Sequence, residues 1–195
     1  MRPGYGERHP DVAALLEAST AVMRAELAWG DGTLPIRVSA YPVVAMVPDE
    51  VVSSVWCIVI VGNRVVLCEN TDGCHPWPGG RRDPGETYVE AACREVHEET
   101  GWLLDPDTIE PLGWLHLEYL TPQREDHPFP HPDFLQVVYV GRATERDCAD
   151  GAEWTDMGGW EVRSRLVTLD EAISQTDPAL CASPYLGLLR HRMTP

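Results

Sequence analysis

The spacing of hydrophobic and polar positions changes along the chain, and each spacing predicts a different element. Residues 11–29 carry apolar positions at helical spacing and are followed by glycines at 30 and 32, so we expect a helix over about 11–29. Residues 51–61 form a nearly continuous apolar run, which predicts a buried strand. Gly62-Asn63 predicts a two-residue hairpin turn into a returning strand over residues 64–69.

Strand patterns and helix starts recur toward the carboxyl end. Strands are predicted over residues 34–46 (either one strand or a strand with a covering segment), 112–120, 134–143 and 160–166. Within 112–120 the residues alternate, and we expect the polar side chains of His116 and Glu118 to point outward, the alternative being that they line a pocket. Asp105-Pro106-Asp107 predicts a turn.

Two short helices are expected near the end of the chain. Thr168 and Glu171 stand at capping-box spacing, and Ser183-Pro184 has the composition of a helix start. Strands mixed with helices in this order predict an α/β fold with a mixed sheet between helices.

A further helix, over residues 88–100, is predicted by its own start and stop signals. Thr87 and Glu90 again stand at capping-box spacing, and Gly101 is a natural stop. Thr87 and Gly101 therefore mark the two expected ends of this helix.

Three glutamates of this helix share one face. At about 100° per residue, Glu95, Glu98 and Glu99 fall within an arc of about 100°. Carboxylates this close raise one another's pKa unless a cation neutralises them, and oxygen ligands suit Mg²⁺ or Mn²⁺. Taken alone, the same face also fits a solvated surface, because charge runs on helices are commonly exposed.

The surrounding residues resemble the signature of the Nudix hydrolases. The matching residues are Gly80, Glu86, Arg94, Glu95, Val96, Glu98, Glu99 and Gly101, and Trp102 occupies the last position of the signature. Trp102 departs from the family, which usually has an aliphatic residue there, but the position is one of packing. The resemblance implies a Nudix-type α/β/α sandwich with a mixed sheet, to which the predicted helix at 11–29 adds an N-terminal extension.

The resemblance also implies a reaction, namely metal-dependent hydrolysis of a diphosphate that links a nucleoside to another group, by attack of water on phosphorus. Glu95, Glu98 and Glu99 would share metal binding and proton acceptance, with Mg²⁺ expected and Mn²⁺ an alternative. The backbone carbonyl of Gly79 would be a further metal ligand, since only glycine lets the backbone approach an ion so closely. Glu86 and Arg94 would support the site through a charge-assisted hydrogen bond.

Loops outside the signature supply further candidates. Arg81 and Arg82 could contact phosphate oxygens, although both also fit exposed loop arginines, and Trp77 could stack on a base. The family often draws a carboxylate from a late loop, and Glu153 is the candidate here. Substrate selectivity is expected to lie in such loops, which the sequence does not decode.

Composition limits the partners. The chain has 195 residues and a formal net charge of −16, so a general electrostatic affinity for nucleic-acid polymers is not expected, whereas a small diphosphate substrate fits a metal-bearing site. The six cysteines form no CxxC pair, which argues against a structural zinc site. No secretory signal or apolar run long enough for a bilayer is present, so a cytoplasmic location is expected.

We divide the chain into an N-terminal extension over residues 1–48 and a Nudix domain with C-terminal helices over 49–195. The helix of the extension is expected to pack on its own domain, the alternative being a dimer contact. A homodimer is an open prediction.

Two other functions stay open at this level. A non-catalytic Nudix-like domain could sense a nucleotide, although such domains usually have eroded signatures. An isomerase of the isopentenyl diphosphate type shares the fold and needs a catalytic cysteine and metal-binding histidines, of which Cys74-His75 is a weak match.

Overall fold

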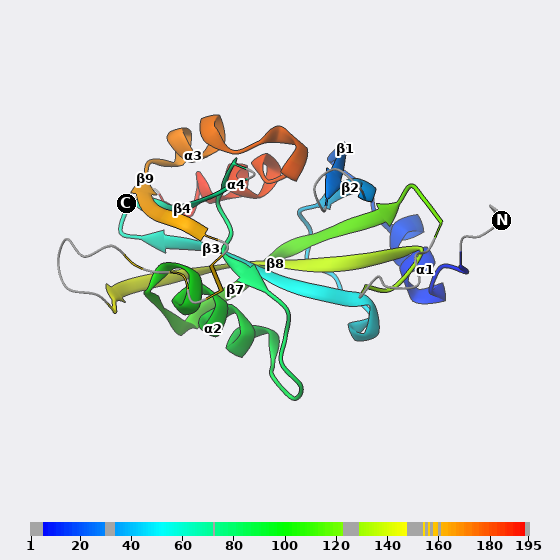
Figure 1. The fold of residues 1–195 in the computed structure, drawn as a ribbon, viewed down its shortest axis with the longest axis horizontal. Coiled ribbons are helices and arrows are strands. Elements are labelled where there is room, and N and C mark those ends of the chain that lie inside the picture. The colour runs from blue at the N-terminus through cyan, green and yellow to red at the C-terminus, as the bar shows by residue number, and fades with distance from the viewer. Residues whose placement is uncertain are drawn as a thin grey trace.

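The computed structural model describes residues 6–29, 34–71, 73–122, 129–147, 154, 156, 158–159 and 161–193. In this part of the chain a twisted sheet separates α2 (Tyr88–Thr100) from α3 (Leu169–Gln175) and α4 (Ser183–Leu189), which cover the opposite face (Figure 1). The predicted α/β/α arrangement is confirmed.

The sheet is mixed and its strands are paired out of sequence order. The strands are β1 (Met23–Trp29), β2 (Leu34–Tyr41), β3 (Val52–Val61), β4 (Arg64–Asn70), β5 (Gly73–His75), β6 (Gly79–Gly80), β7 (Trp102–Tyr119), β8 (Asp133–Arg146) and β9 (Glu161–Val167). The order is β1-β2-β7-β8-β3-β4-β5, with β6 added to β3 and β9 to β4. Only the β3–β8 pairing is parallel among the described strands.

Two apolar layers hold the helices to the sheet. Ala91, Ala92 and Val96 of α2 pack against side chains of β3 such as Val55 and Cys57. On the other face, α4 buries three side chains, Tyr185, Leu186 and Leu189, in a larger cluster that also includes residues of β2, β3 and β7. Alternate residues of β3 serve the two layers, because successive side chains of a strand point to opposite faces.

The N-terminal helix is shorter than predicted. The helix α1 spans Pro10–Ala18, and residues 23–29, expected to continue it, form β1, antiparallel to β2. In β1, Met23, Ala25 and Leu27 alternate with more exposed residues and pack on the core. The apolar positions of this segment fit both periods, and the free edge of β2 supplied the hydrogen bonds that favour the strand.

The helix α1 packs on its own domain, as expected. Val12 is fully buried in a cluster with Tyr41, Val51, Trp114 and Leu135. The ring of Tyr41 stacks on that of Trp114 with centroids 3.9 Å apart. The division of the chain at residue 48 stays a prediction, and β1 and β2 from the proposed extension join the same sheet as the rest.

One expectation for residues 102–120 was wrong. The predicted turn at Asp105-Pro106-Asp107 is a local irregularity within the long strand β7: the pairing with β8 shifts between Asp105 and Glu110, and the backbone N–H of Asp107 donates to the side chain of Asp105. His116 does not point to solvent, since it is 5 % exposed. The reason is a buried partner: Nε2 of His116 lies 2.9 Å from the carboxylate of Asp133, which also binds Arg8.

The described helices include none that is both long and apolar enough to cross a lipid bilayer. The other predicted helices and hairpin are present. The two helix-start motifs begin α3 and α4, the turn at Gly62-Asn63 joins β3 to β4, and residues 42–48 follow β2 as a segment without regular structure.

Candidate active site

The helix α2 is held at both ends by its own sequence. The Thr87 side chain accepts from the backbone N–H of Glu90, and the Glu90 side chain accepts from the backbone N–H of Thr87, so the predicted capping box is present. Gly101 has a φ of 72° and ends the helix in the left-handed region. The site is therefore built on a rigid element.

A residue that the sequence did not place also fixes the end of α2. The indole N–H of Trp154 donates to the backbone carbonyl of Glu98, with a distance of 2.9 Å. A Cβ atom at Gly101 would lie 2.4 Å from the Trp154 ring, so the glycine also makes room for this indole.

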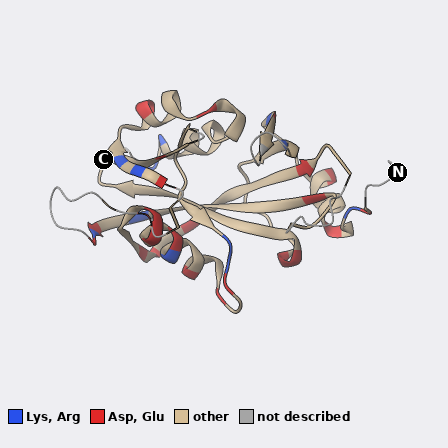
Figure 2. Cartoon of the chain, viewed as in Figure 1, with Lys and Arg blue, Asp and Glu red and all other residues tan. Residues whose placement is uncertain are grey.

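The three predicted glutamates lie together on α2 but differ in exposure. The side chain of Glu95 is 13 % exposed and that of Glu98 is 36 % exposed. The carboxylate of Glu99 accepts from the backbone N–H of Gly79 at 3.0 Å. Figure 2 shows acidic positions along α2 with few basic ones between them.

Arg94 connects these carboxylates to the preceding loop. Its guanidinium donates two hydrogen bonds of 2.9 Å to the two oxygens of Glu86, the pairing expected from the sequence. It also donates to Glu95 at 2.8 Å, to Glu98 at 3.3 Å and to the backbone carbonyl of Arg81 at 2.8 Å. One planar cation thus orients three carboxylates, which a lysine could not do.

The glycine pair of β6 allows the loop to pass between the sheet and the acidic helix. A Cβ atom on Gly79, whose φ is 157°, would lie 2.1 Å from the carbonyl oxygen of Val55. A Cβ atom on Gly80 would lie 2.6 Å from the carboxylate of Glu95. The backbone of β3 therefore requires glycine at position 79, whereas at position 80 a side chain would displace the Glu95 carboxylate; the role of the Gly79 carbonyl as a metal ligand stays a prediction.

Two further carboxylates reach the site and were missed by sequence reasoning. Asp156 is 8 % exposed and the side chain of Glu161 is 4 % exposed. Glu161 begins β9, and its backbone N–H donates to Asp156 at 2.8 Å. The predicted late-loop carboxylate, Glu153, lies outside the described residues. A carboxylate at a strand start among other loop acids carries no local signal that distinguishes it.

Burial and neighbouring charges raise the pKa of two of these carboxylates. Burial is the largest cause that raises the pKa of Glu99 to about 9, and the charge of Glu161 is the next largest. The charges of Glu95 and Asp156 also raise this pKa, whereas the hydrogen bond from the Gly79 N–H lowers it. Burial also raises the pKa of Glu95, and Arg94 offsets only part of this rise. A bound cation would favour the ionised forms of both groups.

The residues present fit a hard divalent cation. The nearby side-chain donors are carboxylate oxygens, which Mg²⁺ and Mn²⁺ prefer. The Oε2 atom of Glu161 is buried and has no hydrogen-bond partner in the described part of the chain. An unpaired carboxylate oxygen beside other carboxylates is costly unless a cation or water occupies the space.

The remaining predicted residues, Arg81, Arg82 and Trp77, each have a contact of their own. The guanidinium of Arg81 lies over the ring of Phe129, 4.7 Å from its centroid. Arg82 pairs with Asp49 at 2.7 Å and lies over the ring of Tyr88, so structural contacts hold it. Trp77 is 4 % exposed and packs in the apolar layer beneath α4, which favours a packing role.

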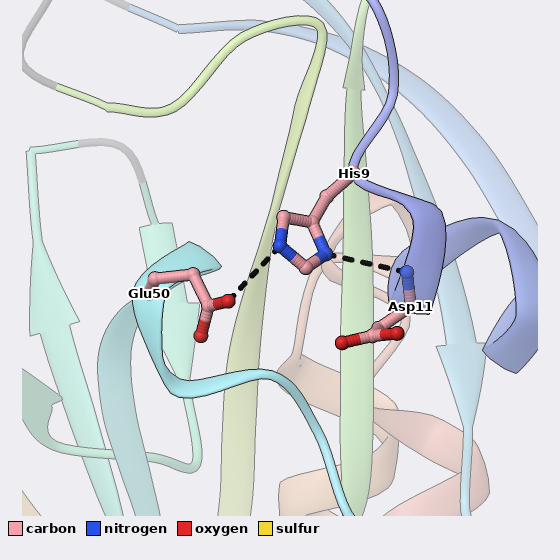
Figure 3. A group of neighbouring side chains, drawn as sticks. All are labelled: His9, Asp11 and Glu50. Carbon is pink, nitrogen blue, oxygen red and sulfur yellow. Dashed lines mark hydrogen bonds and ion pairs between the residues drawn. The ribbon is translucent and has the colours of Figure 1, made fainter.

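A second group with metal-ligand chemistry lies far from α2 in sequence. His9, Asp11 and Glu50 place one ligand atom each within 4.8 Å of one another (Figure 3). Nδ1 of His9 accepts from the backbone N–H of Asp11 at 3.3 Å, and Nε2 lies 2.9 Å from Glu50. Both ring nitrogens are therefore used in capping α1 and joining it to the 3₁₀ turn at Asp49–Val51.

Comparison with known proteins agrees with the fold and the signature. The sequence model of the NUDIX domain matches residues 51–183, and the chain therefore belongs to the Nudix family. It is 42 % identical over 59 residues to an RNA pyrophosphohydrolase of Afipia carboxidovorans, covering 29 % of this chain and 36 % of that protein. It is 31 % identical over 109 residues to an ADP-ribose pyrophosphatase of Methanocaldococcus jannaschii, covering 51 % of this chain and 59 % of that protein.

The matched segments thus span between about a third and three fifths of these relatives. Among solved structures, a mutant of the Bacillus subtilis pyrophosphohydrolase BsRppH has a TM-score of 0.56 at 21 % identity, covering 87 % of this chain and 99 % of that one. This likeness establishes the shared fold.

Proposed function

We propose that the protein is a divalent-cation-dependent hydrolase that cleaves a diphosphate bond in a nucleoside diphosphate linked to another group. One observation carries the proposal: Glu95, Glu98 and Glu99 stand together on a capped helix, beside the Gly79-Gly80 segment, with Arg94 orienting them. Relatives of the chain bear pyrophosphohydrolase names.

The cation, Mg²⁺ or Mn²⁺, would be held by Glu95, Glu98, Glu99 and the carbonyl of Gly79. When bound it would offset the charge of the diphosphate and polarise the phosphorus–oxygen bonds. The role of Arg94 and Glu86 is to keep the carboxylates in place before substrate arrives, which lowers the cost of organising the site.

The chain's own groups account for the proton balance. Water attacks one phosphorus, the bond from that phosphorus to the bridging oxygen breaks, and a carboxylate accepts the proton that water loses. Glu98 is the more exposed of the pair that Arg94 contacts on α2, at 36 % against 13 % for Glu95, and so has the better access to solvent water. Any of the three glutamates can serve as the base in this proposal.

The substrate is a small phosphorylated molecule. A net charge of −16 disfavours long polyanions, which need many lysines and arginines. Arg81, whose backbone carbonyl is fixed by Arg94 and whose side chain lies on Phe129, is the cation of the loop best placed to meet a phosphate. Trp77 and Glu153 are not needed for the proposal.

The structure offers no support for the isomerase alternative. Cys74 and His75 are adjacent on β5 and so project to opposite faces. Cys74 packs against the apolar layer, while His75 pairs with Glu161. A sensor without catalysis would bind a nucleotide but show no metal-dependent turnover.

The test is a panel of diphosphate compounds incubated with purified protein and Mg²⁺, with products identified by chromatography. We expect release of a mononucleotide or a phosphorylated product. Glu98→Gln should lower turnover by roughly 100-fold or more, since a ligand or base is lost. Glu145→Gln, at an exposed position of β8, is the matched control and should retain activity. Full activity of Glu98→Gln, or no turnover of any compound, contradicts the proposal.

A further inference from the structure

The loop over residues 81–87, which joins β6 to α2, contains a turn but no strand or helix. Within it, the backbone N–H of Asp83 donates to the Glu86 carboxylate at 2.9 Å, and the N–H of Glu86 donates to the Asp83 carbonyl at 3.0 Å. Glu86 also binds Arg94, which contacts glutamates of α2. The conformation of this loop therefore bears on the candidate site.

Arg82 joins the 81–87 loop to a segment outside the signature. Its Nη1 donates to the backbone carbonyl of Glu86 at 3.2 Å, and its Nη2 donates to Oδ2 of Asp49 at 2.7 Å. Its guanidinium also lies over the ring of Tyr88, 4.2 Å from the centroid. A planar guanidinium can make these three contacts at once, whereas the ammonium group of a lysine could not.

Asp49 holds the other end of these contacts. It begins the 3₁₀ turn Asp49–Val51, which leads into β3 and is anchored by the buried side chain of Val51. Its Oδ1 accepts from the hydroxyl of Tyr88, the first residue of α2. Hydrogen bonds from Tyr88 and from Arg82 lower the pKa of Asp49, so it is ionised at neutral pH. One carboxylate thus binds a residue near the start of the loop and the residue that follows its end.

The exposure of the ion pair separates an effect on geometry from an effect on stability. The side chain of Asp49 is 64 % exposed and that of Arg82 is 26 % exposed. Ion pairs this open to water contribute little to the free energy of unfolding, because water screens the charges. They can still fix the loop, since both of its ends are bound to one anchored carboxylate.

We propose that Asp49 is a positioning residue of the candidate active site. By holding both ends of the 81–87 loop, Asp49 keeps Glu86 in the conformation that pairs with Arg94. Arg82 acts here through its hydrogen bond to Glu86, rather than as a phosphate ligand. The inference rests on the proposed function, because Glu86 and Arg94 serve the reaction through the glutamates of α2.

Hydrogen exchange of the purified protein, without metal or substrate, measures the order of the loop directly. Asp49→Ala should accelerate exchange of the Asp83 and Glu86 amides roughly fivefold, because the hydrogen bonds that protect them open more often. Asp170→Ala is the matched control, because it removes an exposed pair with Arg190 of similar length, 2.8 Å, and should leave these amides unchanged. Both variants should keep melting temperatures close to that of the wild type.

Steady-state kinetics on a diphosphate that the protein hydrolyses separates positioning from substrate contact. Asp49→Ala and Arg82→Leu should each lower kcat roughly fivefold and leave KM nearly unchanged, a smaller effect than the roughly 10-fold to 100-fold of groups that touch a ligand directly. Asp49→Asn, whose amide oxygen still accepts a hydrogen bond, should recover part of kcat. In the Glu86→Gln background, Asp49→Ala should have little further effect on kcat, because the two residues act as a unit.

The outcomes are distinguishable. An unchanged kcat in Asp49→Ala contradicts the inference and leaves the proposed function in place. A raised KM with unchanged kcat in Arg82→Leu also contradicts it, because Arg82 would then bind substrate. If the wild type hydrolyses no diphosphate, the proposed function is wrong, and amide exchange alone decides whether Asp49 positions the loop. If Arg82→Leu does not fold, Asp49→Ala and Asp49→Asn still decide the question.

Discussion

Two glycines, at which a side chain would meet other atoms, shape the candidate site. At Gly80, a Cβ atom would meet the carboxylate of Glu95, and at Gly79 it would meet the backbone of β3. The first obstacle is the end of a flexible side chain, whereas the second cannot move. The sequence signature marks both glycines, but only the structure shows what each one approaches.

Gly80→Ala should therefore damage the site without unfolding the protein. The added methyl displaces the Glu95 carboxylate, and a displacement of about 1 Å in such a site can lower turnover roughly 100-fold. Diphosphate turnover and chemical denaturation would be measured together. Gly187→Ala in α4, where nothing lies within 4 Å of the added Cβ, is the matched control and should keep activity and gain about 0.5 kcal/mol. Unaltered turnover in Gly80→Ala would contradict this account.

Residues whose partners lie close by in the sequence were predicted correctly, and residues with distant partners were not. Glu86 and Arg94 were paired correctly because the motif that contains them is short and dense. Glu161 was missed because its partner His75 comes from a distant segment, as does Glu99, whose pKa it raises. His116 was misplaced because its buried partner, Asp133, comes from the neighbouring strand β8, and alternation along one strand does not reveal that contact.

Elements with their own start and stop signals were the easiest to foresee. The helices α2 and α3 both begin with a complete capping box. The segment 23–29 has no such signals, and its apolar positions suit a helix and a strand equally. Pairing with β2, a tertiary contact, makes this segment a strand.

The two capping boxes allow a matched test of what the α2 cap contributes. Thr87→Ala and Thr168→Ala should each lower the free energy of unfolding by about 1 kcal/mol, because each leaves backbone N–H groups of a first turn without an acceptor. Only Thr87→Ala should also reduce turnover, by a few-fold, since fraying would disturb the adjacent Glu86 and its contact with Arg94. Equal activity of the two variants would show that the first turn of α2 does not influence the site.

At the scale of the whole molecule, a buried ionic network joins Arg8, in the segment before α1, to the sheet. Asp133 is 2 % exposed and binds Arg8, and also His116 of β7. Arg8 and Arg37 also pair with Glu118, at 3.3 Å and 2.7 Å. Burial would raise the pKa of Asp133, but the hydrogen bond and charge of His116 and the contact with Arg8 outweigh it and lower the pKa.

Asp133→Asn should destabilise the protein by about 3 kcal/mol at neutral pH, because it removes one partner from a buried ion pair. The native pKa lies below the ordinary value of 3.8, so this stabilisation is complete above that value and disappears as pH falls through the native pKa. Denaturation of both proteins across acidic pH would measure it. A stability difference that persists unchanged below the native pKa would contradict the assignment.

The sequence by itself determined the family, the caps of α2 and the reaction class that Glu95, Glu98 and Glu99 suggest, because these depend on residues close together in one helix and its loop. Tertiary structure alone decided that residues 23–29 join the sheet, that His116 is buried, and that Glu161 pairs with the buried His75 and raises the pKa of Glu99 by its charge. Contacts between distant segments arise from strand order and burial, and a local pattern carries no record of which distant strand will be its neighbour.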